Sequence, residues 1–170
     1  MDKLEFKKLL FEVAFCTMAC DGDIDKREIE ELKIMDKNTS YFAEIDLSDE
    51  LEILIKELET KGVKVIEDLF KTLRKTKLNP IQELLILEIA LRIIYADKKV
   101  DDNEIKFLNL LRSMLEVHDE IIFDRFGEVE ILYINEYISK LNKSDNDFLA
   151  NLNLPDMVDI KNIDLTKAKK

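Results

Sequence analysis

Four acidic residues of this chain recur at a fixed distance further along it. They are Glu12, Asp21, Asp25 and Glu28, which return 76 positions later (12 to 88, 21 to 97) as Glu88, Asp97, Asp101 and Glu104. The apolar residues between them keep the same offset, as Ala14 and Ala90 do. A constant offset is typical of a duplicated supersecondary unit. Because hard cations prefer carboxylate oxygens on short loops, the pattern favours cation binding over bond-making catalysis.

The first acidic loop is the richer of the two. Its alternating aspartates resemble the start of an EF-hand, but Lys26 stands where that loop needs Gly and Leu32 where it needs the bidentate Glu. The sequence therefore predicts a weaker or differently built site for a divalent cation, Ca²⁺ or Mg²⁺. The predicted metal-binding residues are Asp21, Asp23, Asp25 and Glu28 in the first loop and Asp97, Asp101 and Glu104 in the second.

Helix capping offers an alternative explanation for four of these residues. Asp25 with Glu28, and Asp101 with Glu104, have the spacing of a capping box, in which side chains satisfy the first backbone N–H groups of a helix. Carboxylates there also suit the positive end of the helix dipole. Capping alone therefore accounts for these four residues without an ion.

Capping does not explain Asp21 and Asp97. Each falls at the C-terminal end of a predicted helix, where a carboxylate costs roughly 0.3–1 kcal/mol against the helix dipole. A positive group should offset each charge. Lys98 and Lys99 follow Asp97, whereas Gly22 and Asp23 follow Asp21. The first loop is therefore the better candidate for a bound cation, and Gly22 gives it backbone freedom.

Glu12 and Glu88 stand inside apolar helical runs, where an acid needs a partner. Arg92 follows Glu88 by one helical turn and is its expected partner. Cys16 occupies the corresponding position after Glu12. We hypothesise that Glu12 makes a buried polar contact across the two repeats, with Arg92 as the candidate base.

Other chemistry is sparse in the sequence. Cys16 and Cys20 lie one turn apart and are interpreted as buried thiols in a reducing compartment, with a soft-metal thiol pair as the sharper alternative. The single histidine, His118, lies outside the repeats. The chain has no zinc-type Cys/His spacing, phosphate-binding glycine loop or nucleophile elbow, so we expect no enzymatic activity.

Apolar residues recur with helical spacing through most of the chain. With three Gly and two Pro among 170 residues, the sequence predicts an all-α, compact bundle of about seven helices built from two pseudo-symmetric helix-loop-helix repeats. We expect a duplicated core over residues 1–115 and an extension over 116–170 that packs on it and is irregular beyond residue 143. The expected helices cover 3–20, 25–36, 48–60 (capped by Ser48), 65–73, 80–96, 101–115, 118–126 and 129–142.

The net charge of −11 limits the expected partners. A negative field repels phosphate backbones and anionic lipid surfaces, so direct nucleic-acid binding is not expected. Mimicry of nucleic acid by the acidic surface remains an alternative. No apolar run is long enough to span a bilayer and no secretory signal is visible, so we expect a cytoplasmic protein that is not transmembrane.

The doubled motif resembles the signature of the TerB-like, tellurite-resistance family. The first copy is Ala19-Cys20-Asp21-Gly22-Asp23-Ile24-Asp25 with Glu28, and the weaker second copy is Tyr95-Ala96-Asp97-Lys98-Lys99-Val100-Asp101 with Glu104. Leu78-Asn79-Pro80, at the start of the second long helix, is also similar to the family pattern. The resemblance covers residues 5–115, and the chain departs from it at Lys98, where the motif favours Gly.

The resemblance implies a helical, non-enzymatic module that acts in tellurite resistance, chemical-stress responses or phage defence. It also implies acidic metal positions at the helix junctions and protein partners in a membrane-associated complex. The leading hypothesis is accordingly a stress-response or defence module that binds a divalent cation and docks onto other proteins. The alternatives are a scaffold whose acids serve only as caps and as solubilising charge, and an enzyme acting through the acidic cluster.

Overall fold

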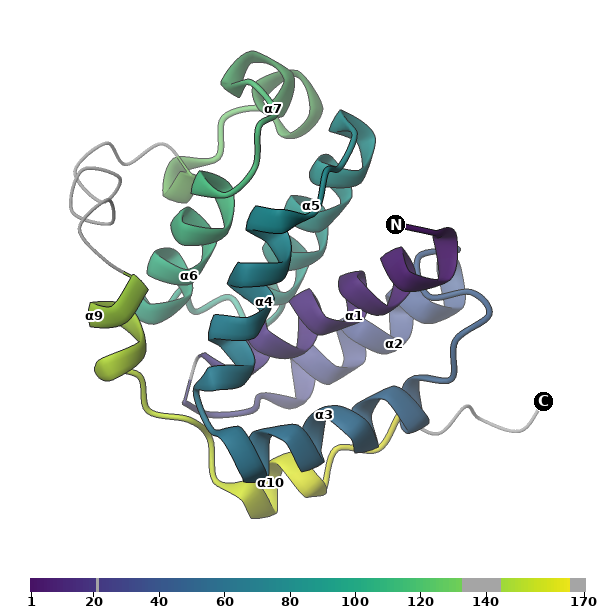
Figure 1. Cartoon of the computed structure of the whole chain (residues 1–170), viewed down its shortest axis with the longest axis vertical. Helices are drawn as coiled ribbons and strands as arrows, with labels where there is room; N and C mark the ends of the chain where they lie inside the picture. Colours follow the sequence, from purple (N-terminus) through teal and green to yellow (C-terminus); the bar gives the residue numbers. More distant parts are fainter. Residues whose placement is uncertain (21, 133–144, 166–170) are drawn as a thin grey trace.

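The computed structural model describes residues 1–20, 22–132 and 145–165, and within these ranges it contains helices and no strand. The predicted all-α bundle is confirmed (Figure 1). The helices are α1 (Lys3–Ala19), α2 (Lys26–Asn38), α3 (Leu47–Lys61), α4 (Lys64–Lys75), α5 (Pro80–Ala96), α6 (Asp102–Ser113), α7 (Asp119–Phe126), the 3₁₀ turn η1 (Glu130–Leu132), α9 (Asp145–Ala150) and α10 (Met157–Lys161).

Two helices form the centre of the bundle. α1 and α5 pack against each other, and most of their residues are buried on every side. Both lack a broad polar face because their sequences are apolar almost all round, which is the pattern of a helix surrounded by protein. Burial of apolar surface on these two helices therefore provides the main stabilisation of the core.

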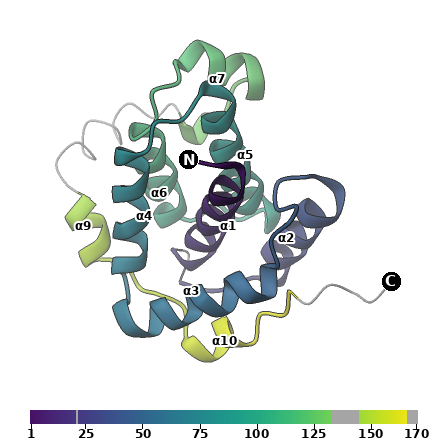
Figure 2. The same cartoon turned by 45° about the vertical axis from the view of Figure 1, so that its right-hand side comes forward.

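The duplication is visible in the packing around this central pair. α2, the second helix of the first repeat, packs on α5, and α6, the second helix of the second repeat, packs on α1 as well as on α5 (Figures 1 and 2). Each hairpin thus covers the long helix of the other.

The connecting helices complete the core. α3 and α4 flank α1, and the loop before α3 inserts Phe42, which is fully buried and meets the Phe11 ring edge-on at 6.0 Å between centroids. Across the bundle, the Phe70 ring of α4 lies 5.8 Å from the Phe107 ring of α6. These aromatic contacts bring the repeats and their connection into one core.

The C-terminal segment packs against α3 and α4, the two helices that connect the repeats. α9 packs against α4 and α10 packs against α3, with Ile160 fully buried (Figure 2). Lys161 of α10 also forms an ion pair with Glu59 of α3. The prediction of an irregular chain beyond residue 143 is therefore wrong, because short helices form wherever a few apolar residues reach the core.

Two further differences concern helix ends. Asp46, rather than Ser48, caps α3, since its carboxylate accepts the N–H groups of Ser48 and Asp49 at 2.9 and 3.2 Å. The helix predicted over 129–142 begins as the short turn η1, and the rest of it lies outside the described residues. The predicted start at Asn79-Pro80 is confirmed, with Asn79 as the N-cap and Pro80 at the first helical position.

Candidate functional site

The candidate site consists of the two loops inside the repeated hairpins. Elbow 1 (residues 20–25) joins α1 to α2, and elbow 2 (residues 97–101) joins α5 to α6. Gly22 has a φ of +80°, and Lys98, 76 positions later, has a φ of +62°. The left-handed backbone conformation has thus been kept in both copies, although it costs a residue with a side chain roughly 1 kcal/mol.

The aspartate and glutamate that follow elbow 1 form a capping box at the start of α2. Asp25 accepts the N–H of Arg27 at 2.7 Å, and the N–H of Asp25 donates to Glu28 at 3.4 Å. The Arg27 guanidinium also donates to both oxygens of Asp25, each at 3.1 Å. This side-chain hydrogen bond is the first cause that lowers the pKa of Asp25. The carboxylate that was predicted to bind metal is therefore already neutralised locally.

Elbow 2 repeats this arrangement at the start of α6. Asp101 accepts the N–H of Asn103 at 2.6 Å, and its own N–H donates to Glu104 at 3.0 Å. Glu104 and its counterpart Glu28 are both fully buried. The capping prediction is confirmed for both copies, and each copy satisfies backbone N–H groups that would otherwise be left unpaired at a helix start.

Asp97 is 7% exposed and accepts the N–H of Lys99 at 2.9 Å. Asp97 is thus stabilised by a neutral backbone N–H of the turn that Lys98 begins, rather than by the ammonium group of Lys98 or Lys99 as expected. The charge of Arg27 reaches Asp97 as well: the pKa of Arg27 is raised first by Asp25 and, to a smaller extent, by Asp97. The Lys99 charge in turn is one of the smaller causes that lower the pKa of Asp25. The start of α2 and elbow 2 therefore interact weakly through charge, Arg27 with Asp97 and Lys99 with Asp25.

The remaining metal predictions concern Asp21 and Asp23. Asp21 lies outside the described residues, and Asp23 is exposed. Over residues 1–20, 22–132 and 145–165, no three His, Cys, Asp or Glu side chains are placed to hold one metal ion together. The residues that the structure does bring together, Asp25 with Glu28 and Asp101 with Glu104, are those that cap helices.

Elbow 1 has a neighbour that the sequence did not reveal. A Cβ atom on Gly22 would lie 3.2 Å from the backbone oxygen of Asn153, in the segment between α9 and α10. The C-terminal segment therefore crosses elbow 1 at van der Waals distance. Glycine is favoured there for two reasons, its positive φ and this close approach.

The hypothesis that Glu12 pairs with Arg92 is wrong. Arg92 donates through Nε to Glu31 of α2 at 2.6 Å, which also removes it as the partner of Glu88. Glu12 instead faces α3 and α4. Its pKa is raised to about 7, first by burial and then by the negative charges of Glu57, Asp68 and Glu50, while Lys61 lowers it.

Glu88 has two partners from distant parts of the chain. It accepts hydrogen bonds from the Tyr41 hydroxyl and from the Arg125 guanidinium. The pKa of Tyr41 is raised, first by burial and then by this hydrogen bond. No local spacing could have identified residues that are 47 and 37 positions away.

The two cysteines are buried thiols, as the sequence predicts. Cys16 and Cys20 are both fully buried and are not joined in a disulfide. Burial raises the pKa of the Cys16 thiol, and the neighbouring charges of Glu12 and Glu57 raise it further. Because the thiolate is the reactive form, these residues behave as apolar core.

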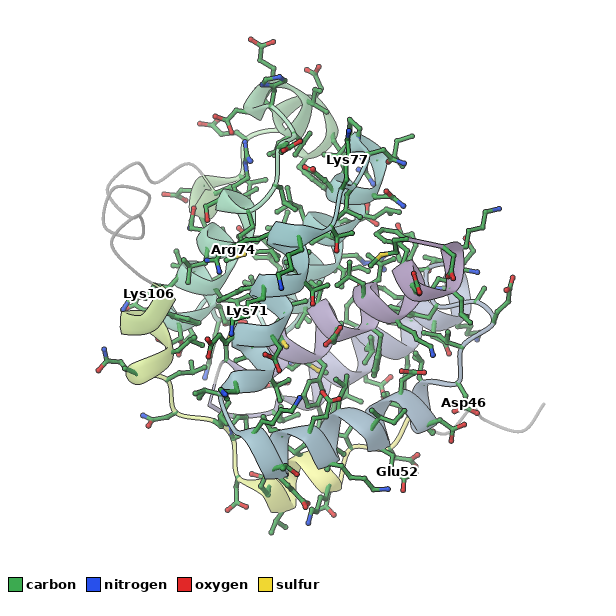
Figure 3. The ribbon with its side chains drawn as sticks, viewed as in Figure 1. Asp46, Glu52, Lys71, Arg74, Lys77 and Lys106 are labelled. Atoms are coloured by element: carbon green, nitrogen blue, oxygen red, sulfur yellow. The ribbon has the colours of Figure 1, made fainter. Side chains whose placement is uncertain are left out.

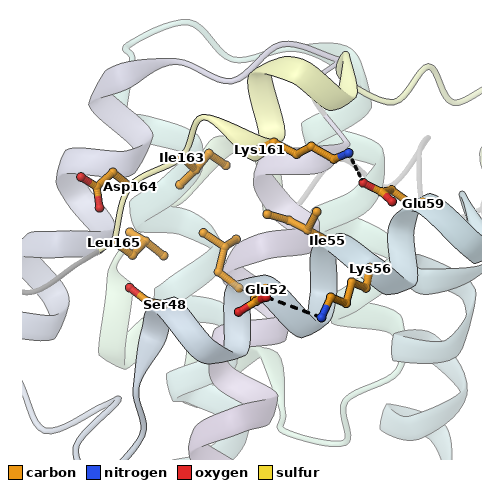
Figure 4. A pocket seen from close by; sticks show the side chains of 10 residues that line it. Ser48, Glu52, Ile55, Lys56, Glu59, Lys161, Ile163, Asp164 and Leu165 are labelled. Atoms are coloured by element: carbon orange, nitrogen blue, oxygen red, sulfur yellow. Dashed lines mark ion pairs between the residues drawn. The ribbon is translucent and has the colours of Figure 1, made fainter.

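A hollow of about 430 Å³ lies between α3 and the segment that follows α10 (Figure 4). Apolar side chains such as Ile55, Ile163 and Leu165 form its floor. Ion pairs line its rim, between Lys56 and Glu52 at 3.5 Å and between Lys161 and Glu59 (Figure 4). The first pair lies within α3, and the second, which is exposed, fastens α10 to α3 only weakly.

In the part of the chain that the structure describes, no helix combines the length and the apolar character that crossing a bilayer requires. Comparison with protein-family models, with curated proteins and with solved structures finds no match to this chain. The resemblance to the TerB-like family therefore rests on the sequence motifs alone, the doubled acidic motif and Leu78-Asn79-Pro80.

Proposed function

We propose that this protein is a non-enzymatic docking module of the stress-response or defence kind that the doubled motif implies. The elbow carboxylates of Asp25 and Asp101 are engaged with helix N-termini, so the repeats serve to build a firm bundle. Partner proteins then bind to the outer surface of the bundle. This proposal gives the acidic motif a structural role and locates the function away from it.

The observation that carries the proposal is the surface of α7. Phe123 is 54% exposed and Ile121 is 37% exposed, on a helix whose other outward side chains include Asp119, Glu120 and Asp124. Aromatic side chains are enriched at the centre of protein-binding surfaces, and the rim of such surfaces is polar. α7 is itself fastened to the core by Ile122, which is fully buried.

Complementation with a surface variant tests this function. A strain lacking the gene, carrying either the wild-type protein or Phe123→Ala, is challenged with tellurite and with phage. We expect the wild type to restore survival and Phe123→Ala to lose most of the protection, while its melting temperature stays within about 2 °C because the side chain is largely exposed. Equal survival with both proteins, or no effect of the wild type, would overturn the proposal.

Cation binding at elbow 1 is the second candidate function. It is favoured by the backbone oxygen of Asn153, which adjoins Gly22 and adds a carbonyl to the exposed carboxylate of Asp23. Carbonyl and carboxylate oxygens are the ligands that Ca²⁺ takes in proteins. The affinity would be weak, since Asp25 is already paired with Arg27.

Thermal unfolding separates the two candidates. If elbow 1 binds a cation, millimolar Ca²⁺ or Mg²⁺ raises the melting temperature, and Asp21→Asn/Asp23→Asn abolishes the rise. Glu120→Gln/Asp124→Asn on α7 also removes two negative charges and should leave the rise intact. An unchanged melting temperature in the wild type would eliminate the cation and leave the docking module.

A further inference from the structure

The longest stretch of this acidic chain without an acidic residue is residues 69–82. The protein has 37 Asp and Glu among its 170 residues, yet residues 69–82 contain neither. The same stretch holds four cations, Lys71, Arg74, Lys75 and Lys77. Since the whole chain has a net charge of −11, the remainder carries −15 (−11 − 4). Residues 69–82 are therefore a net positive stretch of an otherwise negative chain.

The structure extends this positive charge from α4 to α6. We define the basic surface as Lys71, Arg74, Lys75, Lys77 and Lys106. Figure 3 shows Lys71, Arg74 and Lys77 along the same side of the molecule as Lys106. The contact between the Phe70 and Phe107 rings, at 5.8 Å, joins the two helices next to Lys71 and Lys106.

Helix stability accounts for only part of the basic surface. Lys71 forms an ion pair at 3.1 Å with Glu67, one turn earlier on α4. Arg74 and Lys75 lie in the last turn of α4, where cations interact well with the helix dipole. Lys77 lies beyond the end of α4, and Lys106 lies in the first half of α6, toward its positive end. The dipole gives no reason for cations at these two positions.

A hollow of about 390 Å³ opens on this surface, between the end of α4 and the end of α6. Arg74, Lys75 and Lys77 line it together with two acids, Glu83 and Glu116. The carboxylate of Glu83 is turned toward the backbone, since it accepts the N–H groups of Glu116 and Val117, both at 2.8 Å. Its charge is thus engaged inside the wall, and the cations dominate the opening.

We propose that the basic surface docks an acidic segment of a partner protein. Complementary charge gives such a surface its specificity and its association rate. Ile81, at the end of the same stretch, is 72% exposed and offers an apolar contact to the bound segment. The occupant is therefore a short chain in which carboxylates alternate with apolar side chains.

The same features disfavour a nucleic acid as the occupant. Phe70 is fully buried and residues 69–82 contain no Tyr or Trp, so the stretch offers no exposed aromatic ring on which a base could stack. A long polyanion would also meet the charge of −15 on the rest of the chain. A short acidic segment contacts the basic surface alone and avoids this repulsion.

Fluorescence anisotropy with a labelled peptide of repeated Glu-Glu-Leu triplets tests the proposal, in low salt with EDTA. Lys71→Gln/Lys75→Gln/Lys77→Gln should weaken binding roughly tenfold, because three exposed ion pairs are lost. The matched control is Lys26→Gln/Lys33→Gln/Lys37→Gln on α2, which removes three exposed lysines elsewhere. We expect the control to change the affinity less than about twofold. Circular dichroism confirms that both variants fold.

Duplex DNA and vesicles of phosphatidylcholine with phosphatidylserine are titrated in parallel. Tighter binding of either than of the peptide, no peptide binding, or equal loss in both triple variants would overturn the proposal. The inference rests on the docking function proposed above but not on α7. A failed peptide titration with a survival defect in Phe123→Ala removes only the basic surface. Peptide binding without that survival defect overturns the function proposed above for α7 and leaves the basic surface as a binding site.

Discussion

Glu12 and Glu88 occupy the same position of the two repeats, one on each central helix, yet their surroundings are opposite. Glu88 accepts hydrogen bonds from Tyr41 and Arg125, which supply a hydroxyl and a positive charge. Glu12 faces acids from α3 and α4, and its pKa is raised to about 7. The duplication kept the glutamate in both repeats, whereas its effect on stability depends on the side chains that surround it in each.

The difference follows from the segments that cover each repeat. α5 is covered near Glu88 by the loop before α3 and by α7, and these contribute the two donors. α1 is covered near Glu12 by α3 and α4, which contribute Glu57, Glu50 and Asp68 along with Lys61. A conserved offset in sequence therefore predicts equivalent backbone but not equivalent chemistry.

Removal of the Glu88 carboxylate should have the largest effect on stability. Glu88→Ala leaves Tyr41 and Arg125 without their acceptor and should lower the free energy of unfolding by about 2–3 kcal/mol. Glu12→Ala, at the equivalent position, removes a repelled charge and should cost less than about 1 kcal/mol at pH 8. Urea unfolding measures both, and equal losses would contradict the difference in environment.

The raised pKa of Glu12 should make the free energy of unfolding depend on pH. Its pKa is about 7 in the folded protein and 4.5 in its ordinary state, so the folded chain holds the proton more tightly. Its stabilising contribution is complete below pH 4.5 and is lost as the pH rises to about 7. Glu12→Gln should remove this slope and raise the free energy of unfolding at pH 8 by about 1–2 kcal/mol.

Unfolding in urea between pH 5 and pH 8 checks this prediction. Glu88→Gln serves as the control, because the corresponding residue on α5 has donors to stabilise its charge. If wild type and Glu12→Gln followed parallel curves over this range, Glu12 would not be the group that titrates.

The two elbows provide a smaller test at the backbone. Gly22→Ala forces a side chain into a positive φ and to 3.2 Å from the Asn153 oxygen, and should cost about 1–2 kcal/mol. Lys98→Gly relieves the same strained conformation in elbow 2 and should stabilise the protein by up to about 1 kcal/mol. Opposite shifts in melting temperature would confirm that one backbone conformation was copied, whereas equal shifts would contradict it.

The sequence predicted most of the fold because the fold depends on local patterns. Apolar spacing, the capping boxes at Asp25 and Asp101, and the Asn79-Pro80 start all act within one or two turns of a helix. Errors arose where a contact from elsewhere decides the structure. The short helix α10 forms because Ile160 reaches the core, which no periodicity of five residues could show.

The candidate site was harder to predict for the same reason. The capping pairs could be recognised, since both members lie three residues apart. The partners of Arg92 and Glu88 come from residues 31 and 125, and only the packing of α2 and α7 brings them near. The approach of Asn153 to Gly22 is likewise a product of tertiary structure.

Asp25 and Asp101, the aspartates that recur in the two repeats, cap the N-termini of α2 and α6. Asp25→Ser/Asp101→Ser tests it most directly, because serine caps a helix as well as aspartate does but has no carboxylate to offer an ion. Differential scanning calorimetry in EDTA and in Ca²⁺ should show a variant within about 1 kcal/mol of the wild type, with the same response to the cation. A wild type that Ca²⁺ stabilises and a serine variant that it does not would contradict the claim.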